Sequence, residues 1–151
     1  MRRLFPFSLF LLLSWSLAVT ANSVSIEDDL FLGVWSPMQT RWESKVPVCV
    51  EADTVQSPYR VVAAGRNPNT FALTNNIADQ VRYNVFWHTG KHYKRRDELS
   101  PSVPSKRAYP NNGDCRSRPT GYIQVSLNRQ DIDSAIPGVY QDTLVLMLSP
   151  L

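Results

Sequence analysis

The sequence predicts an all-β protein folded as one sandwich domain. Seven short segments carry strand-like patterns, no stretch sustains the 3.6-residue period of a helix, and 11 prolines interrupt the chain. At 151 residues and 43% hydrophobic, the chain is long enough for one domain with a core of its own. It shows no internal repeat and no sign of a second domain.

The first 21 residues are predicted to be a cleaved signal peptide, and residues 22–151 the mature domain. Arg2 and Arg3 form a basic start, residues 4–17 are mainly apolar, and small or modest residues precede a cleavage site after Ala21. The apolar run is shorter than the roughly 20 residues that a transmembrane helix needs. We therefore expect export to the periplasm and then to the cell surface.

Charge and cysteine content narrow the classes of function. Two of the 16 Lys and Arg lie in the leader, so 14 face 13 Asp and Glu in the mature chain. Such a nearly neutral chain is not expected to bind nucleic acid. Cys49 and Cys115 are the only cysteines, and an oxidising compartment favours a disulfide between them. Closing this long loop would stabilise the fold by about 4 kcal/mol if it acts on chain entropy.

The first half of the mature chain contains four predicted strands. The acidic residues 22–29 are predicted as a frayed lead-in. Apolar runs that stop at Ser-Pro, Gly or Asn-rich turns then predict strands at residues 30–35, 46–50, 59–64 and 71–73. Pro47 predicts an edge or a bend at the start of the second strand.

The second half begins with the clearest strand pattern. Residues 80–87 alternate, with Val81, Tyr83 and Val85 on the apolar face. Residues 89–115 contain several prolines and are predicted as a long loop with room for a short turn of helix. Residues 122–127 alternate as another strand, and residues 131–135 resemble a single helical turn.

The last strand follows a turn signal at Pro137-Gly138. Apolar rows lie on both of its faces, with Tyr140, Leu144, Leu146 and Leu148 on one and Val145 and Met147 on the other. This pattern predicts a central strand buried on both faces. Because only Leu151 follows Pro150, we expect no later strand to pair with it, so its free edge has to be managed.

No catalytic or metal site is predicted. His88 and His92 are the only histidines, and their spacing would chelate a metal well only on a helix, not beside a strand end. There is no Gly-x-Ser-x-Gly elbow, and the acidic pairs at 97–98 and 131/133 are typical of hydrated turns. We therefore expect no enzymatic activity, no cofactor and no metal.

Two other features could bind a partner. A basic cluster of Lys91, Lys94, Arg95 and Arg96 could meet an anionic surface, although a charged run in a loop is usually only hydrated. Trp35, Trp42 and Trp87 could stack on sugars in a secreted carbohydrate-binding module. Packing in a core or at its rim is the more usual role of such side chains.

Several short motifs also run in order along the mature chain. They are Leu32-Gly33-x-Trp35-x-Pro37, Val48-Cys49-Val50, Pro58-Tyr59-Arg-Val61, Val81-Arg-Tyr83-Asn-Val85 and Pro137-Gly138-x-Tyr140-x-Asp142-Thr-Leu144. In this order the chain resembles the spore coat U domain family, the subunits of archaic Csu-type chaperone–usher pili and related coat proteins.

The resemblance implies a single, incomplete immunoglobulin-like β-sandwich that lacks its final strand and is completed by a donor strand from a partner. The partners would be a periplasmic chaperone, an outer-membrane usher and neighbouring pilus subunits, with a surface or glycan receptor for adhesion and biofilm formation. The terminal strand would line the donor-strand groove, with Tyr140, Leu144, Leu146 and Leu148. The remaining motif residues would be structural.

The start of the mature chain leaves two roles open. A polymerising subunit needs an alternating apolar extension to donate, and Val24 and Ile26 are the only apolar residues among 22–29. Either Asn22 to Leu32 is itself the donor strand, or the subunit accepts a strand and never donates, as at the tip of a fibre. A secreted carbohydrate-binding module and a non-fimbrial coat protein are the alternative functions.

Overall fold

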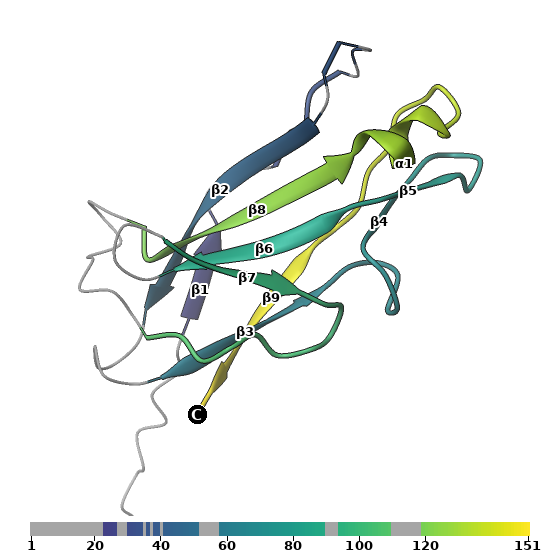
Figure 1. The fold of residues 1–151 in the computed structure, drawn as a ribbon. Coiled ribbons are helices and arrows are strands. Elements are labelled where there is room, and N and C mark those ends of the chain that lie inside the picture. The colour runs from purple at the N-terminus through teal and green to yellow at the C-terminus, as the bar shows by residue number, and fades with distance from the viewer. Residues whose placement is uncertain are drawn as a thin grey trace, which may run out of the picture.

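The computed structural model describes residues 23–26, 30–34, 36, 38–39, 41–51, 58–89, 94–109 and 119–151. They form an all-β sandwich with open sheets and one short helix (Figure 1), which confirms the predicted fold class. In chain order the elements are β1 (Ser23–Ile26), β2 (Arg41–Glu51), β3 (Tyr59–Ala64), β4 (Ala72–Thr74), β5 (Gln80–Arg82), β6 (Asn84–Thr89), β7 (Arg95–Leu99), β8 (Gly121–Asn128), α1 (Arg129–Asp133) and β9 (Val145–Pro150).

The sandwich has two layers. One is a five-stranded antiparallel sheet in the order β1-β2-β8-β6-β7. The other is the pair β3-β9, which crosses one face of the larger sheet in Figure 1, and β4 and β5 form a separate two-stranded sheet. This arrangement leaves β9 paired with a single strand in the part of the chain that the structure describes.

The core fills the space between the layers. Alternate residues of β3, Tyr59, Val61 and Ala63, are buried, as period-2 strand geometry requires. They meet buried side chains of the larger sheet such as Val85 and Trp87. Each fully buried valine contributes about 1.5–3 kcal/mol relative to leaving it in water. This packing holds the two layers in register.

Several predicted strands are confirmed. The strand at residues 59–64 is β3, and the strand at 122–127 lies within β8. The predicted strand at 80–87 is divided into β5 and β6, because the Tyr83 N–H turns aside to donate to the Phe71 carbonyl at 3.1 Å. The predicted apolar face is correct, since Val81, Tyr83 and Val85 are all buried.

The N-terminal prediction is wrong in two places. The predicted lead-in contains β1, whose main chain pairs with β2 in the register Val24↔Val50 and Ile26↔Val48. The described part of the predicted strand 30–35, residues 30–34, is not a strand. An apolar run becomes a strand only where another main chain lies beside it, and residues 30–34 have no such neighbour among the described residues.

Two further predictions for the first layer are wrong. β2 begins at Arg41, so Pro47 lies inside the strand opposite Tyr122 rather than at its start. The predicted loop at 89–115 contains β7, an edge strand beside β6. Asp97 lies on β7 and is buried rather than hydrated, since it accepts the Lys106 N–H at 2.6 Å.

The last strand also differs from its prediction. β9 is an edge strand and is not buried on both faces, because Val145 and Met147 remain 50% and 47% exposed. The other row, Leu144, Leu146 and Leu148, packs against the core as predicted. Among the described residues, no helix is both long and apolar enough to span a membrane. The predicted signal peptide lies outside the described ranges.

Candidate functional site

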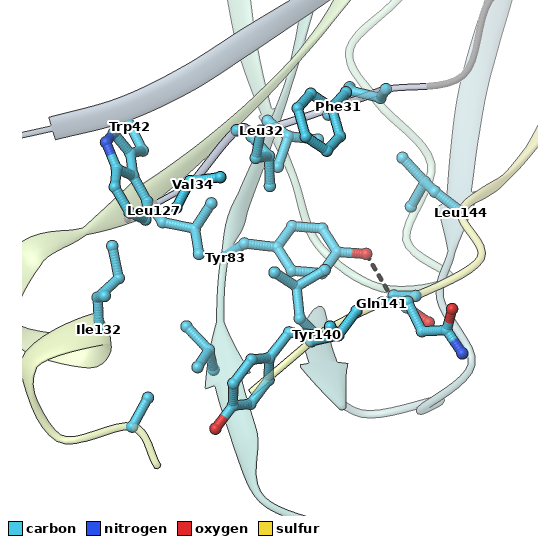
Figure 2. Close-up of a pocket in the computed structure, with 18 of the residues that line it drawn as sticks. Phe31, Leu32, Val34, Trp42, Tyr83, Leu127, Ile132, Tyr140, Gln141 and Leu144 are labelled. Atoms are coloured by element: carbon cyan, nitrogen blue, oxygen red, sulfur yellow. Dashed lines mark hydrogen bonds between the residues drawn. The ribbon is translucent and has the colours of Figure 1, made fainter. Parts of the chain in front are cut away.

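A groove of about 1690 Å³ runs along the sandwich. Its floor comes from the larger sheet, through Val46 on β2 and Ile123, Val125 and Leu127 on β8. Figure 2 shows Phe31, Leu32 and Val34 along one side, Tyr140, Gln141 and Leu144 along the other, and Tyr83 between them. We call residues 30–34 the N-terminal lip and residues 135–144 the C-terminal wall.

The groove offers mainly apolar surface on both sides. Leu30 and Leu32 of the N-terminal lip pack against the core, while Phe31 and Val34 are 79% and 85% exposed. Across the groove, Leu144 and Leu146 are partly buried. An extended segment lying here could therefore bury apolar side chains against both sides and the floor.

The hydrogen-bonding register of β3 shows which way the main chain of β9 faces. The Val61 and Ala63 carbonyls accept N–H groups of the segment 102–108, from Ser105 and Ser102, at 2.8 Å each. Along an antiparallel strand, successive residues direct their main-chain groups to opposite neighbours. Because Val61 and Ala63 bond the segment 102–108, the residue between them, Val62, bonds β9 through its partner Met147. The main-chain groups of Leu146 and Leu148 therefore point away from β3.

The two outer edges of the β3-β9 pair therefore differ in their main-chain hydrogen bonding. On the β3 side, residues 102–108 cap the edge, and Ala108 and Tyr59 exchange two main-chain hydrogen bonds of 2.9 Å. On the β9 side, the described residues contain no main-chain partner for Leu146 or Leu148. An uncapped edge beside an apolar groove is the arrangement to which an added β-strand binds.

One end of the groove is closed by α1 and its surroundings. Ile132 and Ala135 line this end together with Trp42, whose indole N–H donates to the Gln39 side-chain carbonyl. Figure 2 shows Trp42, Leu127 and Ile132 grouped there. This end therefore offers an apolar surface to a large side chain.

Two tyrosine–aspartate pairs stand beside the C-terminal wall. The Tyr83 hydroxyl donates to Asp142 at 2.6 Å, the dashed bond in Figure 2. Burial, and then this hydrogen bond, raise the pKa of Tyr83 above its ordinary value. The Tyr140 hydroxyl donates to Asp79, and this bond, followed by the one from the Ile136 N–H, lowers the pKa of Asp79.

The predicted groove residues are largely brought together. Tyr140, Leu144 and Leu146 line the groove, and Leu148 continues their row against the core. Gly33 also lines it and has a φ of +90°, a conformation that only glycine adopts without strain.

Other motif residues have different positions. Tyr59 is buried in the core, whereas Asp142 anchors the C-terminal wall. Gly138 has no unusual φ, and an added Cβ would lie 3.7 Å from its nearest neighbour, so its structure does not require glycine. Trp35 and Pro37 lie outside the described residues.

Of the three aromatic candidates for sugar binding, the structure describes Trp42 and Trp87. Trp87 is 1% exposed and lies in the core, so it cannot stack on a sugar. Trp42 lines the groove instead. For Trp87 the favoured interpretation, packing in the core, is therefore confirmed.

The remaining candidates that the structure describes do not line the groove. The His88 ring is hydrogen-bonded to Gln124 at 2.7 Å, and His92 falls outside the described residues. Within the described ranges, no group of three metal-ligating side chains comes together. Arg96 of the basic cluster lies 3.6 Å over the Phe86 ring. Cys49 is buried and Cys115 lies outside the described residues, so their disulfide stays a prediction.

Sequence reasoning missed the N-terminal lip and the anchoring residues of the C-terminal wall. Residues 30–34 have a strand-like pattern, and nothing local in the sequence reveals that no described strand pairs with them. Asn75 and Asp79 left a detectable signal, because Asn75 Oδ1 accepts the N–H groups of Ile77 and Asp79 in a side-chain-capped turn. Their contact with Tyr140 spans more than 60 residues of chain and has no local signature.

Comparison with known proteins supports the fold. No model of a known protein family matches the chain, and no curated protein sequence matches it. A chain in a solved structure of a chaperone–tip adhesin complex of CFA/I fimbriae biogenesis is similar, with a TM-score of 0.57 and 12% identity. The match covers 86% of this chain and 42% of the other, so this chain spans about two fifths of that protein. The protein described here has an all-β, immunoglobulin-like sandwich fold.

Proposed function

We propose that this protein is a non-enzymatic fimbrial subunit whose groove accepts a β-strand from another protein. The observation that carries the proposal is the open edge of β9, where Leu146 lines the apolar groove and turns its main-chain groups away from β3. An added strand would satisfy these groups and bury its alternate side chains on the floor.

The similarity to a chaperone–tip adhesin complex supports the same class of partners. On this basis we propose that a periplasmic chaperone and neighbouring pilus subunits occupy the groove at different times, and that an outer-membrane usher assembles the fibre. The order of motifs from Gly33 to Leu144 adds the finer proposal of a Csu-like subunit of the spore coat U family.

The proposal includes export and a surface location. Cleavage after Ala21 would release the domain into the periplasm, where Cys49 and Cys115 would be oxidised. Adhesion and biofilm formation, through a surface or glycan receptor, are the corresponding roles at the cell surface.

We also propose that residues 23–34 serve this subunit itself and are not given to a neighbour. β1 pairs with β2 through four residues, and residues 30–34 form one side of the groove. Donating this segment would dismantle the groove that accepts a strand. The segment therefore favours the accepting role that suits a minor or tip subunit.

The test is thermal unfolding of purified residues 22–151 with and without a synthetic twelve-residue peptide of alternating valine and threonine. We expect the peptide to raise the midpoint, because a ligand that binds only the folded state stabilises it. Leu146→Asp, which places a charge beside the open edge, should abolish the gain. A wild-type protein that unfolds reversibly at high temperature and ignores the peptide would refute strand acceptance.

The non-fimbrial coat protein remains the second candidate function. A coat protein of this family would have the same sandwich fold, so the groove does not distinguish it from a fimbrial subunit. A chaperone and an usher encoded beside this gene would favour the fimbrial role, and copurification with such a chaperone would test it directly.

A further inference from the structure

The C-terminal wall of the groove is irregular in structure. It runs from the end of α1 to the start of β9, and residues 135–144 contain only an isolated bridge between Gln141 and Thr74. Yet this wall supplies Tyr140 and Leu144 to the groove. Ordering an irregular segment costs backbone entropy, and if that cost fell on the binding step it would weaken the binding of a strand.

The first anchor of this wall is the turn between β4 and β5. The Tyr140 hydroxyl donates to Asp79 Oδ2, and the Ile136 N–H donates to the same oxygen at 2.9 Å. Asn75 also donates to the Tyr140 hydroxyl, at 3.3 Å. A single carboxylate therefore holds two points of the wall that are four residues apart.

The second anchor lies at the end of β3. Asp142 accepts the Tyr83 hydroxyl at 2.6 Å through one oxygen and the Arg66 N–H at 3.2 Å through the other. Gly65 makes this approach feasible, because a Cβ there would lie 2.9 Å from Asp142 Oδ2. Between the anchors, Gln141 and Thr74 exchange main-chain hydrogen bonds of 3.0 and 3.1 Å.

The tyrosine rings and hydroxyls have separate tasks in this geometry. Both rings line the groove, where an added strand would contact them, whereas both hydroxyls are used by aspartates that hold the wall. In Figure 2 the Tyr83 hydroxyl reaches toward the C-terminal wall, and the Tyr140 hydroxyl points away from Tyr83.

We propose that the pairs Tyr83–Asp142 and Tyr140–Asp79 hold the C-terminal wall in its strand-accepting shape before a strand binds. They are positioning residues, and this inference rests on the proposed function. The aspartates fix the wall and the rings complete the apolar surface, so the ordering cost is met during folding rather than during binding.

The test deletes the hydroxyls and keeps the rings, with the variants Tyr83→Phe and Tyr140→Phe. Tyr109→Phe, at a half-exposed tyrosine outside the groove lining, is the matched control. Hydrogen exchange of the free proteins should show faster exchange confined to residues 135–144 in the two groove variants. Binding of the alternating valine–threonine peptide, followed by Trp42 fluorescence, should weaken about tenfold for each lost charge-assisted hydrogen bond.

The outcomes separate this inference from the proposed function. Unchanged exchange and unchanged peptide affinity in both variants would overturn the inference while leaving strand acceptance intact. Faster exchange spread equally over β8 would also overturn it, because the tyrosines would then support stability in general. A wild-type protein that does not bind the peptide would instead overturn the proposed function.

Discussion

Asp79 and Asp142 show how single residues shape this molecule. Each carboxylate accepts hydrogen bonds from both a tyrosine hydroxyl and the main chain, so each ties segments that are far apart in sequence. Hydrogen bonds to a charged group are stronger than those between neutral groups, and their contribution to stability declines as the groups become exposed to water. At this scale the protein should therefore respond to pH.

Asp79 should make stability fall in acid. Its folded pKa is lowered by the Tyr140 hydroxyl and then by the Ile136 N–H, so its contribution is present above the ordinary carboxyl pKa of 3.8. The contribution is lost as pH falls through the folded pKa. Urea unfolding at about pH 6 and about pH 3 should show a smaller acid loss for Asp79→Asn than for wild type. Equal acid losses in Asp79→Asn and wild type would contradict this role of Asp79.

Tyr83 should make stability fall in alkali. Burial and the Asp142 carboxylate raise its folded pKa above 10.0, so its contribution is fully present below that pH and declines as pH rises toward the folded pKa. Unfolding free energies measured at about pH 8 and about pH 11 should differ less in Tyr83→Phe than in wild type. Equal alkaline losses in the two proteins would contradict this assignment.

At the scale of elements, β9 differs in burial between its two faces and in hydrogen bonding between its two edges. One edge bonds β3 and the other faces the groove, while Leu146 turns toward the core and Met147 toward solvent. Edge strands are usually blunted by charge, proline or a covering loop, as residues 102–108 do for β3. The open edge of β9 does not follow this rule, which indicates that it is a binding site for another strand.

Substitutions on the two faces of β9 should have unequal effects. Leu146→Thr removes apolar surface that packs on the core and should cost about 1–3 kcal/mol of unfolding free energy. Met147→Thr, one residue away on the half-exposed face, should cost less than about 0.5 kcal/mol. Chemical denaturation of both variants measures this difference, and equal losses would mean that β9 is buried on both faces.

At the scale of the whole molecule, the sandwich combines a continuous core with exposed apolar surface beside the groove. The larger sheet and β3 bury a continuous core, but apolar side chains of the N-terminal lip (Phe31 and Val34) and of the C-terminal wall (Ile136 and Val139) remain 50–85% exposed beside the groove. Exposed apolar patches of this kind mark interaction sites or promote aggregation. The isolated domain should therefore be marginally stable until a strand occupies the groove.

Dye binding tests this expectation on the intact domain. The free protein should bind a fluorescent probe of apolar surface and aggregate on concentration, and the alternating valine–threonine peptide should suppress both. Light scattering and probe fluorescence give the two readouts. A domain that stays monomeric and does not bind the probe would show that the groove is already covered.

The predicted disulfide is also a property of the whole chain. Joining Cys49 to Cys115 would constrain the unfolded state, so Cys49→Ser should lower the unfolding free energy by about 2–5 kcal/mol. Peptide mapping without reductant should recover the two cysteine peptides linked. Two titratable thiols in each folded chain would contradict the bond.

The sequence by itself determined the fold class and the inward rows of the strands. Alternation of apolar residues is a local property, and it correctly assigned β3, β8 and the buried row Val81, Tyr83 and Val85. It also placed Tyr140, Leu144 and Leu146 on the face that lines the groove. Side-chain direction in a strand depends only on period 2, so no long-range information was needed.

Only the tertiary structure decided which apolar segments have strand neighbours. Residues 23–26 pair with β2, whereas residues 30–34 have no strand neighbour among the described residues, although the second run is the more apolar. Pairing depends on which main chains the fold brings together, and that is fixed by contacts distant in sequence. The same reason explains why the open edge of β9 and the anchors of the C-terminal wall became visible only in three dimensions.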